Sequence, residues 1–114
     1  MGLLDFLSGS GGGNKISAAR AKEIMDGGKP YILIDVRTPQ EFKEKCIKGA
    51  INIPNYELKT RAAKELPDKN ALIIVHCLSG GRSARAASEL VKMGYTNVND
   101  MGGIMNWPYE TIKG

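Results

Sequence analysis

The sequence predicts an α/β domain in which helices cover both faces of a central, mostly parallel sheet. Short apolar runs such as 71–75 alternate along the chain with stretches of good helix-forming residues, and this alternation is typical of a parallel sheet. With 114 residues, the chain is long enough for one domain with a single core. Its 42% hydrophobic and 25% charged residues are ordinary for a soluble globular protein.

The first half of the chain predicts two helices and two strands, the second of which is stopped by a proline. Ser17 can cap a helix over 18–26 that ends at the following glycine pair, and Thr38 can cap a helix that begins at Pro39. The apolar residues indicate strands over 31–36 and 50–53, with Pro54 ending the latter.

The second half continues the alternation. Asn55 can cap a helix that runs to Leu66, where Pro67 breaks it. A buried strand over 71–75 is followed by a loop and by a helix from Ser83 to a glycine cap at Gly94. The remaining residues indicate a strand over 96–100, a turn over 101–103, a short helix over 104–107 and one further turn over 108–112.

Residues 1–14 are expected to be a flexible N-terminal segment, and residues 15–114 the folded domain. The stretch 8–14 is rich in glycine and serine, which is typical of a linker. The first seven residues contain some apolar side chains, but no basic region and no long apolar core, so they predict neither a signal peptide nor a membrane span.

Cys77 lies where the most apolar predicted strand ends and the next helix begins. Ligand and active sites of open α/β sheets form at the carboxyl ends of the strands. The N-terminus of a helix offers unpaired N–H groups and the positive end of the helix dipole. Gly80 and Gly81 allow the loop amides to converge, and Arg82 adds a positive charge. We therefore expect a lowered pKa for the Cys77 thiol, whereas the alternative is a buried cysteine packed as a small hydrophobic residue.

The sequence gives little support for a nucleic-acid interface, a metal or cofactor site, or a histidine base beside Cys77. The net charge of +4 is spread among acidic residues, which indicates a solvated surface and no nucleic-acid partner. Cys46 and Cys77 do not have metal-ligand spacing, so we expect neither a metal nor another cofactor. The one histidine, His76, precedes Cys77 directly, and adjacent strand residues point to opposite faces. His76 is therefore expected on the far side of the sheet and not as the base of the thiol.

Four segments together resemble the single-domain rhodaneses, which are sulfurtransferases of the thiosulfate:cyanide type. They occur in the expected order, cover residues 15 to about 110, and are specific only in combination. The matching segments are Ile34-Asp-Val-Arg-Thr-Pro-Gln-Glu-Phe42, Ile47-Lys-Gly-Ala-Ile-Asn-Ile-Pro54, Val75-His-Cys-Leu-Ser-Gly-Gly-Arg-Ser83 and Gly94-Tyr-Thr-Asn-Val-Asn-Asp-Met-Gly-Gly-Ile-Met-Asn-Trp107. The resemblance implies a three-layer rhodanese-like fold, and it implies that Cys77 accepts a sulfane sulfur as a persulfide.

Loop length and two departures qualify this resemblance. The six residues from Cys77 to Arg82 resemble the count in sulfurtransferases, whereas related phosphatases and arsenate reductases have a longer loop for a bulkier anion. Cys46 occupies a position where the family often has histidine, and His76 one where it often has an aromatic or aliphatic residue. A second role for Cys46 would be to resolve a Cys77 persulfide as a disulfide, which requires the two sulfur atoms to lie close together.

The predicted reaction is a double displacement by a rhodanese-type sulfurtransferase, with Cys77 as the nucleophile. Its substrates would be a small anionic donor such as thiosulfate, or a protein persulfide, and then a thiophilic acceptor: cyanide, a thiol or another protein. We expect a cytoplasmic monomer that acts without membrane or nucleic acid. The anion-binding loop is expected to comprise Leu78, Ser79, Gly80, Gly81, Arg82 and Ser83, with Asp35 and Arg37, beside Glu41, as a supporting charge network.

Two alternative functions remain open from the sequence. One is a non-catalytic rhodanese-like binding module, against which the intact Cys77 and its glycine loop argue. The other is a small phosphatase or arsenate reductase, against which the short loop argues.

Overall fold

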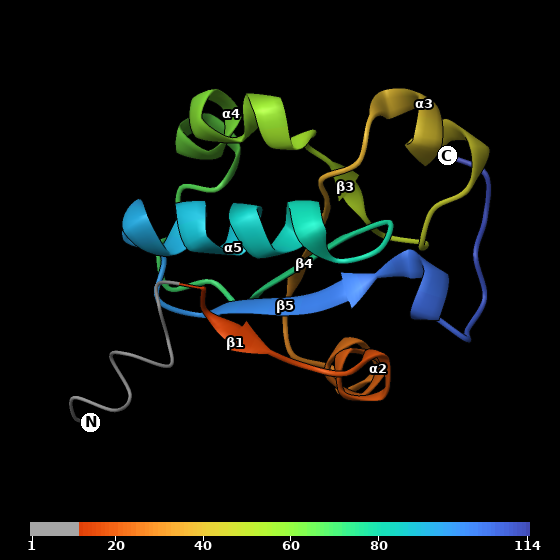
Figure 1. Ribbon diagram of the computed structural model, residues 1–114. Coiled ribbons are helices and arrows are strands. Elements are labelled where there is room, and N and C mark those ends of the chain that lie inside the picture. Colours follow the sequence, from red (N-terminus) through yellow and green to blue (C-terminus); the bar gives the residue numbers. More distant parts are fainter. Residues whose placement is uncertain (1–11) are drawn as a thin grey trace.

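A five-stranded parallel sheet forms the centre of the computed structural model, which describes residues 12–114 (Figure 1). The strand order is β1-β5-β4-β2-β3, and every pairing between neighbours is parallel. The predicted α/β class is therefore confirmed. The strands are β1 (Asn14–Lys15), β2 (Ile32–Asp35), β3 (Ile51–Asn52), β4 (Ile73–Cys77) and β5 (Val98–Gly103).

Helices cover both faces of the sheet and make three layers (Figure 1). α4 and α5 lie on one face and α2 lies on the other. The helices are α2 (Ala18–Asp26), α3 (Pro39–Glu44), α4 (Leu58–Glu65) and α5 (Gly81–Lys92), with two 3₁₀ turns, η1 (Asn55–Glu57) and η2 (Ile104–Asn106). No helix among residues 12–114 is long and apolar enough to cross a membrane.

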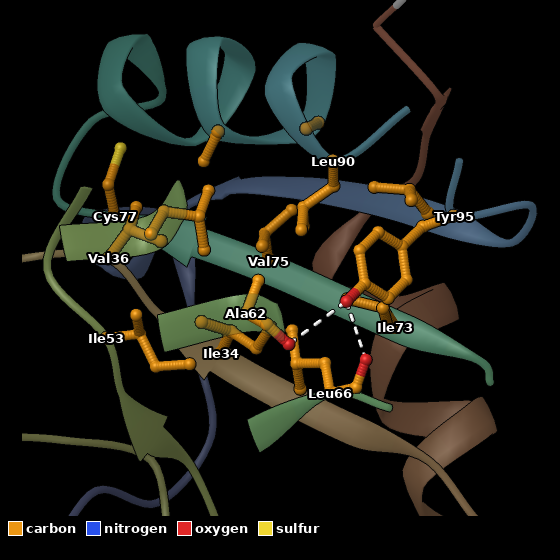
Figure 2. Close-up of a cluster of buried hydrophobic side chains, with 14 residues drawn as sticks. Ile34, Val36, Ile53, Ala62, Leu66, Ile73, Val75, Cys77, Leu90 and Tyr95 are labelled. Carbon is orange, nitrogen blue, oxygen red and sulfur yellow. Dashed lines mark hydrogen bonds between the residues drawn. The ribbon is translucent and has the colours of Figure 1, made fainter. Parts of the chain in front are cut away.

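The larger core lies between the sheet and the α4 and α5 helices. Because side chains alternate along a strand, Ile73, Val75 and Cys77 of β4 all point to this face (Figure 2). The Tyr95 hydroxyl group lies within hydrogen-bonding distance of two carbonyl oxygens, at 3.1 Å from Ala62 and 2.6 Å from Leu66 (Figure 2). The Leu66 carbonyl lies beyond the last intrahelical bond of α4, whereas the Ala62 carbonyl also accepts the Leu66 N–H group at 2.8 Å, so Tyr95 ties the end of α4 to the core.

The smaller core lies between the sheet and α2. Ile74 of β4 and Leu33 of β2 contribute to it, together with Ala21 of α2. By the same alternation, His76 and its register partner Asp35 lie on this face. His76 and Cys77 thus point to opposite sides of the sheet, as the sequence predicts.

Two strands around the site differ from their predicted bounds. β4 begins at Ile73 and ends at Cys77, two residues later at each end than predicted, because it pairs with β5 as far as Cys77. β5 continues through the predicted turn at 101–103 to Gly103. Its register shifts by one residue, so that Val75 pairs with Asp100 but His76 pairs with Gly102. Such a bulge lets an extra residue enter a strand beside a site.

The two ends of the chain also differ from the predictions. The further turn over 108–112 is wrong, since Ile112 instead pairs antiparallel with Cys46. β1 was not predicted, and it places the start of the sheet at Asn14, one residue before the expected domain boundary. Residues 1–11 of the predicted flexible segment lie outside the described residues.

Candidate active site around Cys77

The sulfur of Cys77 accepts two backbone hydrogen bonds from the loop that opens α5. The N–H group of Gly80 lies 3.0 Å from Sγ, and that of Ser83 lies 3.2 Å from it. Gly80 adopts a φ of 120°, which side-chain-bearing residues rarely adopt, so a glycine allows the loop to curl around the sulfur. The thiol therefore sits in a cradle of N–H groups at the N-terminus of a helix of twelve residues.

The cradle lowers the pKa of Cys77 below its usual value. Burial acts against ionisation, but the Ser83 hydroxyl group and the N–H groups of Ser83, Gly80 and Arg82 outweigh it. Donors aimed at the sulfur stabilise the thiolate more than the thiol. The same donors can hold negative charge on a second sulfur atom attached to Sγ.

β5 supports the loop from below through a close approach at Gly103. A methyl group at this position would clash with the carbonyl oxygen of Leu78 and lie 2.7 Å from the Cα atom of Ser79. The N–H group of Met105 donates a hydrogen bond of 3.2 Å to the same Leu78 carbonyl. Gly103 thus shapes the cradle, although sequence reasoning assigned it only to a turn; the adjacent glycines 102 and 103 were the available signal.

Arg82 already has a carboxylate partner in the structure. Its Nη1 atom lies 2.8 Å from Oε1 of Glu41, and its Nη2 atom lies 3.1 Å from Oε2. The Arg82 side chain lowers the pKa of Glu41 to about 2, with burial opposing and Thr38 assisting. Sequence reasoning placed Glu41 beside Asp35 and Arg37, but the structure pairs it with Arg82, which is 41 residues away in sequence.

Asp35 and Arg37 form a separate, buried ion pair at the end of β2. The Arg37 side chain donates to both Asp35 carboxylate oxygens, with Nε–Oδ1 at 3.0 Å and Nη2–Oδ2 at 2.7 Å. The Asn52 amide group donates to the backbone carbonyls of both residues, each at 3.0 Å. Asp35 and Arg37 thus bind each other and Asn52, which is compatible with the predicted role of a charge network that supports the site. That role stays a prediction.

His76 contacts the backbone of Cys77 and not its sulfur. Its Nδ1 atom lies 3.2 Å from the Cys77 carbonyl oxygen, and its Nε2 atom lies 3.6 Å from Oδ2 of Asp35. Burial lowers the pKa of His76, although the nearby Asp35 carboxylate opposes this. The ring is therefore neutral at pH 7, and it faces away from the thiol that it would have to deprotonate.

Cys46 differs from Cys77 in lacking such a cradle. Both thiols are free and buried. The backbone of Cys46 exchanges hydrogen bonds of 2.7 and 2.8 Å with Ile112, but burial raises the pKa of its thiol and the Asp35 charge raises it further. A thiol with a raised pKa is a poor nucleophile at neutral pH. Among residues 12–114, no three His, Cys, Asp or Glu side chains are placed to hold a metal ion.

Comparison with known proteins identifies the family. The rhodanese-like domain family matches residues 17–109 of the chain. The chain is 42% identical over 81 residues to thiosulfate sulfurtransferase PspE of Escherichia coli, covering 71% of this chain and 78% of the relative. It is 34% identical over 105 residues to the chloroplastic thiosulfate sulfurtransferase 16 of Arabidopsis thaliana, covering 82% and 86%.

A solved structure described as a rhodanese with anions from E. coli is also similar. It superposes with a TM-score of 0.65 at 40% sequence identity, covering 75% of this chain and all of the other. The family match spans strands β2 to β5, both helical layers and the loop around Cys77. The chain therefore belongs to the rhodanese-like domain family.

Proposed function

We propose that this protein is a rhodanese-type sulfurtransferase that carries a sulfane sulfur as a persulfide on Cys77. The observation that carries the proposal is the pair of N–H groups, from Gly80 and Ser83, directed at Sγ. They favour a thiolate before the transfer, and they can stabilise the charge on the outer sulfur after it. The relatives named thiosulfate sulfurtransferases support the same reaction class.

The first half-reaction loads the sulfur. The Cys77 thiolate attacks the sulfane sulfur of thiosulfate, a new S–S bond forms, and the S–S bond of thiosulfate breaks. The bonding electron pair leaves with sulfite, which carries two negative charges, and Cys77 retains a persulfide with one. The loop amides donate to Sγ at the N-terminus of α5, where they and the helix dipole would stabilise negative charge on the outer sulfur as well.

The second half-reaction unloads it. Cyanide, or a thiolate of a small molecule or a protein, attacks the outer sulfur of the persulfide, and the electron pair of the broken S–S bond returns to Sγ. With cyanide the product is thiocyanate and the Cys77 thiolate is regenerated. No step needs a cofactor or a metal, because the sulfur atom moves between nucleophiles.

A protein persulfide is the alternative physiological donor, and a reducing compartment such as the cytoplasm is the proposed location. A free Cys77 thiol is required for each cycle, and neither cysteine forms a disulfide. In this proposal, the protein acts as a monomer, without nucleic-acid or membrane partners. A non-catalytic module would need neither the converging N–H groups nor the lowered pKa of Cys77.

Mass spectrometry of the intact protein tests this proposal. Incubation with thiosulfate should add about one sulfur atom, roughly 32 Da, through the covalent route. Cyanide should remove the added mass, and Cys77→Ser should not acquire it. If neither thiosulfate nor the persulfide generated by a cysteine desulfurase adds this mass to the wild-type protein, the sulfurtransferase proposal is wrong.

A further inference from the structure

Glu41 occupies the guanidinium group of Arg82, the charged side chain of the loop 78–83, so this group is not free to bind a sulfur donor. The two side chains make a bidentate ion pair, with N–O distances of 2.8 and 3.1 Å. Thr38 also holds Glu41: its N–H group lies 2.9 Å and its hydroxyl group 3.1 Å from Oε1, the oxygen that also accepts from Nη1 of Arg82. Glu41 is therefore pre-positioned on α3, and the arginine would lose both contacts if it turned towards a substrate.

The charged side chains described above beside the cradle are either paired or neutral. Arg82 is paired with Glu41, Arg37 is paired with Asp35, and the lowered pKa of His76 leaves that ring neutral at pH 7. The positive potential at the sulfur thus comes from backbone N–H groups and the α5 dipole. Because these donors converge on Sγ, they stabilise negative charge on the transferred sulfur. They stabilise charge less well on a part of the donor that stays outside the cradle.

Donors differ in what they leave outside the cradle. Thiosulfate keeps a sulfonate group there, and it departs as sulfite with two negative charges. A persulfide donor, R–S–SH, transfers its outer sulfur with its proton and departs as the thiolate R–S⁻, with one negative charge, while Cys77 becomes Cys–S–SH. Loss of that proton to solvent gives the same Cys–S–S⁻ form that thiosulfate produces. Only the sulfonate needs a guanidinium for charge compensation, and a guanidinium matches its oxygen atoms bidentately.

We infer that Glu41 is a specificity-determining residue that competes with anionic donors for Arg82 and so favours persulfide donors over thiosulfate. The inference rests on the proposed sulfurtransferase function and names the donor class of the same site. Thiosulfate must displace from Arg82 a carboxylate that Thr38 also holds in place, whereas a persulfide can react while the Glu41–Arg82 pair stays intact. Glu41 acts through Arg82, so it is a positioning residue and not a catalytic one.

Glu41→Gln removes the negative charge of residue 41 but keeps its hydrogen-bonding role at the start of α3. A glutamine at the third residue of α3 can still accept the hydrogen bond from the Thr38 N–H group, because the capping box accepts Glu or Gln. The variant loses the negative charge that holds Arg82. Both side chains are about a quarter exposed, at 26% and 28%, so the pair resembles a surface ion pair and its release should change affinity roughly two- to fivefold.

The experiment measures KM and kcat of wild type and Glu41→Gln with thiosulfate and with cysteine persulfide, whose amino-acid group has no net charge. The KM for thiosulfate should fall roughly two- to fivefold in the variant, and the KM for cysteine persulfide should change by less. Raising the ionic strength should shrink the difference, because salt screens the contact between Arg82 and the sulfonate.

Two further variants control the result. Glu65→Gln removes a glutamate that pairs with Arg61 on α4, at 2.6 Å, and should leave the KM ratio of the two donors at its wild-type value. Glu41→Gln combined with Arg82→Gln should lose the gain for thiosulfate, since no guanidinium remains to be released. Far-ultraviolet circular dichroism checks that each variant is folded.

The outcomes distinguish this inference from the proposed function. If wild type transfers sulfur but Glu41→Gln leaves the KM ratio unchanged, or raises both KM values together, the role of Glu41 is wrong and the sulfurtransferase function stands. A gain for thiosulfate that persists in the double variant also overturns the role of Glu41. If neither donor loads sulfur onto the wild-type protein, the proposed function itself fails.

Discussion

Cys77 and Cys46 are two buried thiols in one small domain, and their acidities are shifted in opposite directions. Burial raises the pKa of Cys46, and no hydrogen bond to its sulfur from residues 12–114 compensates for this. Burial acts in the same direction on Cys77, but the Ser83 hydroxyl group and the N–H groups of the loop reverse the outcome. The difference teaches that the local supply of donors, and not burial itself, sets the direction in which the pKa of a buried thiol shifts here.

The largest expected effect separates the two thiols by substitution. Cys77→Ser should reduce sulfur transfer by about three orders of magnitude or more, because it removes the nucleophile. Cys46→Ala should keep transfer within a few-fold of wild type and cost about 1 kcal/mol of stability, since it removes one buried sulfur atom. Steady-state assays with thiosulfate and cyanide, together with urea unfolding, measure both effects. Equal loss of transfer in the two variants would break the comparison.

The next effect tests whether the cradle depends on β5. Gly103→Ala should displace the loop, because its methyl group would clash with the Leu78 carbonyl oxygen. We expect at least about a tenfold loss of transfer and about 2 kcal/mol of destabilisation. Gly28→Ala is the matched control: its φ of 87° makes the substitution strained, but the space around it is open and it lies at the end of α2. An active Gly103→Ala variant would contradict the support from β5.

Titration of the thiols measures the opposite shifts directly. In Cys46→Ala, the ultraviolet absorbance of the remaining Cys77 thiolate should appear with a pKa below 9.0, and in Cys77→Ser that of Cys46 should appear above 9.0. Adding Ser83→Ala to Cys46→Ala should raise the pKa of Cys77, since the Ser83 hydroxyl group favours the thiolate. Indistinguishable pKa values for the two thiols would remove the basis of the comparison.

The smallest effect concerns the acid stability that the Glu41–Arg82 pair contributes. The folded-state pKa of Glu41 is about 2, against an ordinary value of 4.5. A lowered carboxyl pKa stabilises the folded state above the ordinary value, and this contribution disappears as the pH falls from about 4.5 through about 2. Because the pair is partly exposed, we expect about 1 kcal/mol at pH 7.

Urea unfolding of wild type and Glu41→Gln between pH 7 and pH 2 provides the measurement. The wild-type protein should be the more stable at pH 7, and the difference between the two should vanish towards pH 2. A difference that does not depend on pH would show that the Glu41 charge is not responsible.

Local sequence signals predicted most of the architecture but not all of its edges. The Ser17 and Thr38 caps mark the starts of α2 and α3 correctly, because capping depends on residues within one helical turn. β1 escaped prediction because a two-residue strand is defined by its neighbour β5 and has no hydrophobic pattern of its own. Likewise, the antiparallel contact of Ile112 with Cys46 depends on tertiary pairing and not on local propensity.

The site shows the same limit. The position of Cys77 between a strand and a helix was readable from sequence, because the apolar run, the glycines and the helix formers are contiguous. The pairing of Glu41 with Arg82 was not, because it joins residues on different elements. The contribution of Gly103 was missed for the same reason: its close contact is with a backbone carbonyl more than twenty residues earlier in the chain.

Peptide mass mapping after incubation with thiosulfate tests the central claim most directly, because it reports on both thiols in one protein. Our account predicts one added sulfur atom, roughly 32 Da, on the peptide that contains Cys77 and none on the peptide that contains Cys46. Sulfur on Cys46, or equally on both cysteines, would contradict the claim that the loop around Cys77 makes its thiol the sulfur carrier.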